Sequence, residues 1–147
     1  FFEALARHGM NDLAYEAMNK TDFPSYGHWI AQGATTTREQ RDGGNSRNHP
    51  MMGSGLTWFS RNLAGVQYDE THPGYRHIII RPQVPEQMEF VSYSKQTPYG
   101  KVSSELRRKN GQTTVTVTIP VSCTATLVLP IGTKELGQGT YKFIYAE

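Results

Sequence analysis

The chain has 147 residues, of which 37% are hydrophobic and 11% aromatic, and its formal net charge at pH 7 is +2. That apolar content is enough for a packed core and excludes wholesale disorder. The 15 basic residues are nearly balanced by 13 acidic ones, which leaves no basic footprint for nucleic acid. No segment approaches the roughly 18 consecutive apolar residues that a membrane-spanning helix needs. We therefore expect neither nucleic acid nor a membrane as a partner.

Short amphipathic segments make up the first half of the chain. Apolar side chains recur at helical spacing, and Pro24 ends the second segment because proline cannot continue a helix. The pattern predicts helices over residues 1–7, 11–20, 25–32 and 51–66. Helices this short bury little surface, so some apolar faces should need partners. The side chains that we expect on those faces are Leu5, Tyr15, Trp29 and Trp58.

Strand patterns begin near residue 75. They predict strands over residues 76–81, 88–95, 100–109, 113–120, 122–129 and 140–146. Asn110-Gly111 is a strong hairpin signal, and the alternation of Val115 and Val117 with threonines predicts one apolar and one hydroxylated face. Cys123 has no partner for an intrachain disulfide, and a buried small side chain is favoured over a reactive thiol.

The change of pattern predicts an α+β chain with two domains. Residues 1–70 are expected to form an incomplete set of helices, and residues 75–147 a small antiparallel β-sandwich. The chain opens with Phe1 in a helix-like segment and has no initiator methionine. We therefore expect it to begin inside a larger protein.

Chemistry is expected in the polar stretch at residues 33–54, because polar connections lie at the surface and often carry function. Its candidate residues are Arg38, Glu39, Arg41, Asp42, Asn48 and His49. Glu39 is either a solvated surface carboxylate or a base, and His49 is either bonded within a turn or a ligand contact. The histidines lack a metal-ligand spacing, so neither a metal nor a cofactor is expected.

Three motifs carry a family resemblance: GATTTRE at residues 33–39, NSRNHP at 45–50 and YRHIIIRP at 75–82. Together they resemble the α-L-rhamnosidases of glycoside hydrolase family 78. The resemblance implies the last helices of an (α/α)6 barrel followed by a C-terminal β-sandwich. It also implies hydrolysis of terminal α-L-rhamnosides with inversion of configuration, and therefore rhamnose-containing glycans or glycosides as partners.

The same resemblance assigns roles to residues. Glu39 matches the general base, and His49 matches a histidine that contacts the sugar. We add Asn48 and Trp29 as substrate-binding candidates, although packing between helices is an alternative for Trp29. Arg38, Arg41 and Asp42 are assigned supporting roles. Arg38 stands where many members have tryptophan, which alters the wall beside Glu39 and bears on sugar specificity.

The family's general acid lies upstream in the barrel, and no residue of this chain matches it. The chain is therefore expected to be an inactive fragment that needs the remainder of the barrel. The alternative is a non-catalytic carbohydrate-binding or structural sandwich that offers Tyr93, Tyr99, Tyr141 and Tyr145 for stacking. A single cysteine is compatible with a protein on either side of a membrane. For the parent protein, a periplasmic or extracellular location is favoured over the cytoplasm.

Overall fold

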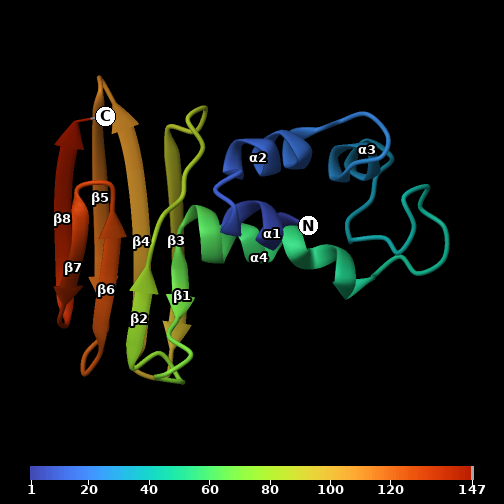
Figure 1. Cartoon of the computed structure of the whole chain (residues 1–147). Coiled ribbons are helices and arrows are strands. Elements are labelled where there is room, and N and C mark those ends of the chain that lie inside the picture. The colour runs from blue at the N-terminus through green and yellow to red at the C-terminus, as the bar shows by residue number, and fades with distance from the viewer. Residues whose placement is uncertain (147) are drawn as a thin grey trace. The chain divides into compact units, whose positions relative to one another are not determined.

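The computed structural model describes residues 1–146 and separates into two compact units. The helical unit comprises Phe1–Trp58, and the sandwich unit begins at Phe59 (Figure 1). Within the described residues, no helix combines the length and apolar character needed to cross a membrane. The α+β fold class expected from the sequence is confirmed.

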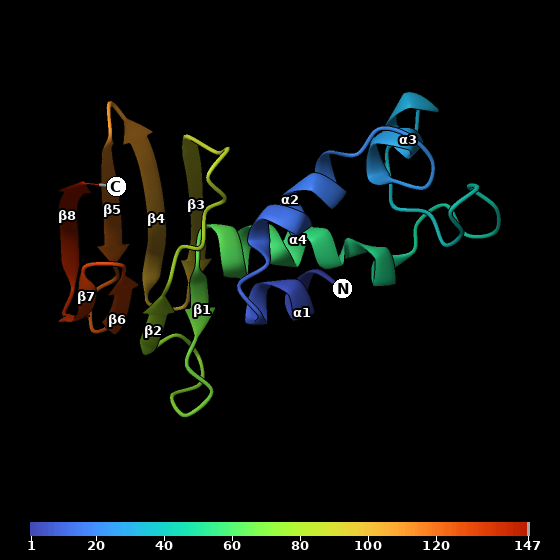
Figure 2. The same cartoon turned by 45° about the horizontal axis from the view of Figure 1, so that its top comes forward.

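The helical unit contains α1 (Phe2–Arg7), α2 (Asn11–Asn19), α3 (Tyr26–Ala31), the 3-10 helix η1 (Pro50–Gly53) and α4 (Ser54–Trp58). The first three confirm the helices expected from hydrophobic spacing. Ser25 caps α3, because its hydroxyl accepts a hydrogen bond from the amide of His28 at 2.9 Å. Between α3 and η1 the chain makes a long excursion without helix or strand (Figure 2), called here the polar loop (residues 32–49).

Both tryptophans are buried, in contrast to the expectation that they would lie on exposed faces. Trp58 is 1% exposed; its indole Nε1 donates to Asn11 Oδ1 at 2.9 Å, and its ring lies 5.7 Å from that of Phe2. An indole N–H that finds an acceptor can be buried at low cost. The unit instead exposes other large apolar side chains, namely Phe1, Met10, Leu13, Phe23, Ile30, Met51 and Leu56.

The prediction of a single helix over residues 51–66 is wrong. The segment is divided among η1, α4 and the π-helix η2 (Phe59–Leu63), and Val66 already begins strand β1 (Val66–Tyr68). Gly65 adopts a positive φ of 75°, and a Cβ there would lie 2.1 Å from the carbonyl carbon of Arg81. This close approach of two backbone segments turns the chain out of helix and into sheet.

The sandwich unit consists of two four-stranded sheets. One sheet has the order β1, β2 (His77–Ile80), β6 (Thr124–Leu129), β7 (Gly132–Leu136), and the other has β3 (Phe90–Thr97), β4 (Gly100–Lys109), β5 (Gln112–Ile119), β8 (Gly139–Ala146). The expected strands are confirmed. Strands β1 and β7 were not anticipated, because β1 lies in the segment read as helix and β7 is short and mostly exposed. One pair, β2 with β6, is parallel, and the others are antiparallel.

Period-two alternation builds the core between the sheets. Ile78, Ile80 and Leu127 from one sheet and Val115 and Val117 from the other are fully buried. Asn110 and Gly111 both have positive φ, 53° and 70°, as a tight hairpin turn requires. Cys123 is 3% exposed, and burial raises the pKa of its thiol. The expectation of a small buried side chain at this position is confirmed.

A buried hydroxyl on β4 predicts one change in stability. Ser104 is 1% exposed, and within residues 1–146 its Oγ has no hydrogen-bond partner. Since a buried unsatisfied donor costs about 1–3 kcal/mol, Ser104→Ala should leave the free energy of unfolding unchanged or raise it by about 1 kcal/mol. Urea unfolding followed by far-UV circular dichroism measures the effect. Val117→Ala, the control at a neighbouring core position, should lower stability by about 2 kcal/mol; a comparable loss in Ser104→Ala would contradict the prediction.

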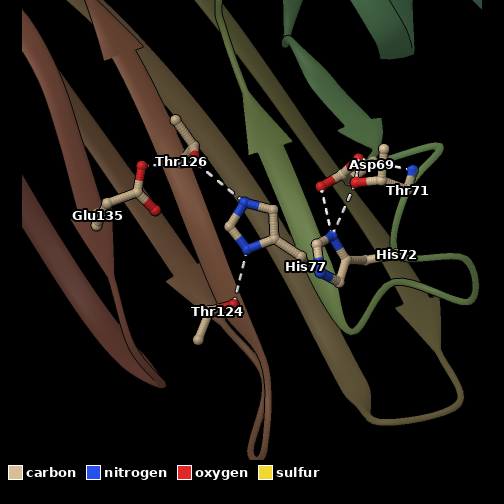
Figure 3. A network of polar contacts seen from close by, with 7 residues as sticks. All are labelled: Asp69, Thr71, His72, His77, Thr124, Thr126 and Glu135. Carbon is tan, nitrogen blue, oxygen red and sulfur yellow. Dashed lines mark hydrogen bonds and ion pairs between the residues drawn. The ribbon is translucent and has the colours of Figure 1, made fainter.

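A polar network covers part of the β1–β2–β6–β7 sheet (Figure 3). Asp69 accepts hydrogen bonds from the amide and hydroxyl of Thr71, and its Oδ2 lies 2.8 Å from His72 Nδ1. His77 lies between the hydroxyls of Thr124 and Thr126, at 2.7 and 2.9 Å. Because His77 is on β2 and both threonines are on β6, these contacts join the parallel pair of strands.

The network predicts an unusually acidic carboxyl group. The side-chain hydrogen bond from Thr71, followed by that from His72, lowers the pKa of Asp69 from 3.8 to about 2. A folded-state pKa below that of the unfolded chain means that the contribution of Asp69 to stability is present above about pH 4, and is lost as pH falls through about 2.

Carboxyl-carbon NMR titration tests this assignment. Thr71→Ala should raise the midpoint of Asp69 toward 3.8, the ordinary value for aspartate. Thr133→Ala, at an exposed threonine of β7, should leave it unchanged. A midpoint near 4 in the unmodified chain would contradict the role of the network.

Candidate functional site

The polar loop satisfies much of its backbone hydrogen bonding internally. The amide of His49 donates to the carbonyl of Thr37 at 2.9 Å, and the hydroxyl of Thr37 donates to the carbonyl of His49 at 2.8 Å. His49 is extended, with φ −108° and ψ 105°, as expected for a residue that precedes a proline. The loop therefore closes on itself just before η1.

A second pair of hydrogen bonds lies further into the loop and involves Glu39. Its amide donates to the carbonyl of Ser46 at 2.9 Å, and the amide of Ser46 donates to Glu39 Oε2 at 3.1 Å. The same Oε2 lies 3.7 Å from His49 Nδ1. Their side chains are 37% and 31% exposed, so solvent reaches both. The loop thus brings together the two residues to which the sequence resemblance assigned chemistry.

The tip of the loop contains two of the expected supporting residues. Asp42 Oδ1 accepts a hydrogen bond from the amide of Gly44 at 2.9 Å, and Arg38 Nη1 donates to the carbonyl of Gly43 at 3.3 Å. Both side chains thus contact the backbone of the turn. Among residues 1–146, His49 is the basic residue whose side chain lies within 4.0 Å of the Glu39 carboxylate.

Trp29 anchors the loop to α3. Its Nε1 donates to the carbonyl of Arg41 at 2.7 Å, and its ring packs edge-on against Tyr26 at 5.6 Å. The side chain is 6% exposed and, with Tyr26 and Arg41, borders a largely apolar hollow of about 400 Å³ within the helical unit. Asn48 is exposed, and its amide donates to Ser46 Oγ at 3.3 Å.

This arrangement is suited to accepting a proton from water. It presents one partly exposed carboxylate, held by a backbone amide and flanked by an imidazole. Within residues 1–146, no group of three or more His, Cys, Asp or Glu side chains is placed to hold a metal.

The tyrosines that would serve a carbohydrate-binding sandwich lie against its core. Tyr93, Tyr99, Tyr141 and Tyr145 are partly buried and pack against the inner cluster. The Tyr99 ring is also covered by the guanidinium of Arg76 at 5.6 Å, whose Nε donates to its hydroxyl at 3.0 Å. These rings therefore take part in the packing of the sandwich.

Sequence reasoning missed the two residues that hold the pair, Thr37 and Ser46. Asp42-Gly43 is a hairpin dipeptide and marks the turn between them. The residues on either side of this dipeptide lack the alternating apolar pattern of a strand pair, so the dipeptide by itself does not predict a reversal of the chain.

Comparisons with known proteins identify the family of this chain. The model of the bacterial alpha-L-rhamnosidase 6 hairpin glycosidase domain matches residues 1–63, and that of the bacterial alpha-L-rhamnosidase C-terminal domain matches residues 65–143. An alpha-L-rhamnosidase of Formosa agariphila is 32% identical over 135 residues, which are 87% of this chain and 14% of that protein.

Two solved structures have the same fold. The crystal structure of Streptomyces avermitilis alpha-L-rhamnosidase complexed with L-rhamnose matches 96% of this chain and 16% of its own, with 26% identity and a TM-score of 0.84. The alpha-L-rhamnosidase from Aspergillus terreus matches 97% of this chain and 18% of its own, with 28% identity and a TM-score of 0.87.

The chain therefore spans about one seventh of the length of the curated relative, 14%. The family resemblance seen in the sequence motifs is confirmed: this chain belongs to the bacterial α-L-rhamnosidase family, and its residues match that family's six-hairpin glycosidase and C-terminal domains.

Proposed function

We propose that this chain is the C-terminal part of an α-L-rhamnosidase in which Glu39 is the general base. The observation that carries the proposal is the Glu39–His49 pair, a solvent-accessible carboxylate held 3.7 Å from an imidazole. The similarity to a rhamnosidase complexed with L-rhamnose supports a terminal α-L-rhamnoside as the substrate.

Inverting hydrolysis requires a second carboxyl group besides Glu39, which the rest of the enzyme must supply. Two carboxyl groups stand about 6.5–9.5 Å apart, one protonating the leaving oxygen and one activating water on the opposite face of the sugar. Glu39 supplies the second function. Asp42 is an unsuitable acid because it holds the turn of the same loop through Gly44.

The surrounding residues take supporting roles in this proposal. His49 and Asn48 contact the sugar from the polar loop. Trp29 forms a wall of the sugar site and holds the backbone of Arg41 through its hydrogen bond to the Arg41 carbonyl. Arg38 contacts Gly43 and so shapes the turn beside the base, which bears on sugar specificity.

The remainder of the barrel is the partner of the helical unit. The helical unit exposes large apolar side chains such as Leu13, Ile30 and Leu56, at 50–70% exposure. Surface of this kind is typical of an interface. The remaining barrel covers it and supplies the general acid, so the 147-residue chain alone has no hydrolase activity.

The central test is Glu39→Gln in the full-length enzyme. Removal of the base should reduce kcat on an aryl α-L-rhamnoside by about 10²–10⁴-fold. Glu105→Gln, which alters a surface carboxylate of the sandwich, is the matched control and should leave kcat unchanged. NMR of the first-formed sugar anomer reports inversion. A near-normal rate in Glu39→Gln, or turnover by the isolated chain that this change abolishes, would overturn the proposal.

A sugar titration separates this function from a binding sandwich. In the full-length enzyme, His49→Ala should weaken L-rhamnose binding by about tenfold, the loss expected for one hydrogen bond near 1.4 kcal/mol. Tyr93→Ala and Tyr99→Ala should leave the dissociation constant unchanged in variants that retain the native melting temperature. Loss of binding through the tyrosines alone would favour the carbohydrate-binding module.

A further inference from the structure

Thr37 closes the base of the loop that carries Glu39 and His49. Its carbonyl accepts from the amide of His49 at 2.9 Å, and its hydroxyl donates to the carbonyl of His49 at 2.8 Å. Thr37 therefore bonds both backbone polar groups of His49, and the His49 carbonyl also accepts a hydrogen bond from the amide of Met52 at 3.2 Å. The neighbouring hydroxyl of Thr36 adds a hydrogen bond to the carbonyl of Arg47.

Glu39 is held in a similar way from the other side of the turn. Ser46 bonds the Glu39 amide through its carbonyl and Glu39 Oε2 through its own amide. His49 Nδ1 approaches the same oxygen. Among the described residues, both of these side-chain contacts are made by the same carboxylate oxygen, Oε2.

The tip between these contacts is closely packed. Gly43 has φ 90°, and a Cβ there would lie 2.7 Å from Arg38 Nη1, which donates to the Gly43 carbonyl. The Asp42 carboxylate holds the amide of Gly44. At the base of the loop, His49 is held by the two Thr37 hydrogen bonds together with that from the Met52 amide.

We infer that Thr37 is a positioning residue for the Glu39–His49 pair, acting through its two hydrogen bonds to the backbone of His49. The inference rests on the proposed function, since it concerns how the same base is aimed. Misplacement of a catalytic group by about 1 Å can cost up to about 10²-fold in rate. Removal of one of the two hydrogen bonds should have a smaller effect.

The test compares Thr37→Val with Thr37→Ser in the full-length enzyme. Valine preserves shape but removes the donor to His49, so kcat should fall by about tenfold while KM stays within about twofold. Serine retains the donor and should restore at least half of the original kcat. Thr114→Val, the same change on the outer face of β5, should have no effect.

Hydrogen exchange supplies a readout that does not depend on activity. In peptides covering residues 36–49, exchange should accelerate in Thr37→Val and stay normal in Thr37→Ser. Normal kcat and exchange in Thr37→Val, or equal losses in the valine and serine variants, would overturn the inference. If Glu39→Gln keeps its activity, the proposed function is wrong. If Glu39→Gln loses activity but Thr37→Val keeps it, the proposed function stands and the positioning role of Thr37 is wrong.

Discussion

The site depends on how an irregular loop satisfies its own backbone. The polar loop has no helix or strand ladder, yet unpaired buried amides and carbonyls are costly. Pairs from Thr37 to His49 and from Glu39 to Ser46 meet part of this requirement, and they fold the loop back on itself. The Glu39 carboxylate and the His49 imidazole meet as a result of this reversal. A backbone constraint thereby produces the arrangement that the proposed chemistry uses.

Buried indole groups connect this loop to its support. Trp29 ties the Arg41 carbonyl to α3, and Trp58 ties α4 to Asn11 at the start of α2. Each indole places its apolar ring among helices while its N–H finds an acceptor, so packing and polar satisfaction are achieved together. The helices that these contacts organise still expose large apolar side chains. A hydrogen-bonded loop on a helical unit with exposed apolar side chains agrees with the match of this unit to part of a six-hairpin glycosidase domain.

The sandwich has a different physical character. Strand alternation directs the aromatic residues of β8 toward the same interior as Val115 and Val117, with Phe143 opposite Val115 and Tyr141 opposite Val117. Rings used in this way stabilise the unit. Its polar network joins β2 to β6 through His77, and Asp69 in the loop after β1 carries an acidic carboxyl group.

Sequence alone determined the features that depend on neighbouring residues: the first three helices, the Asn110-Gly111 hairpin, and the apolar face of β5. Backbone preference and side-chain period act over a few positions, so these patterns can be read directly. The motifs around Glu39 and His49 identified the family, but the side-chain contacts between them were not visible in the sequence. Tertiary structure decided the break at Gly65, the parallel β2–β6 pair, and the approach of Glu39 to His49, because each requires segments distant in the chain to meet. Such contacts depend on the whole arrangement of the backbone, and no local pattern encodes them.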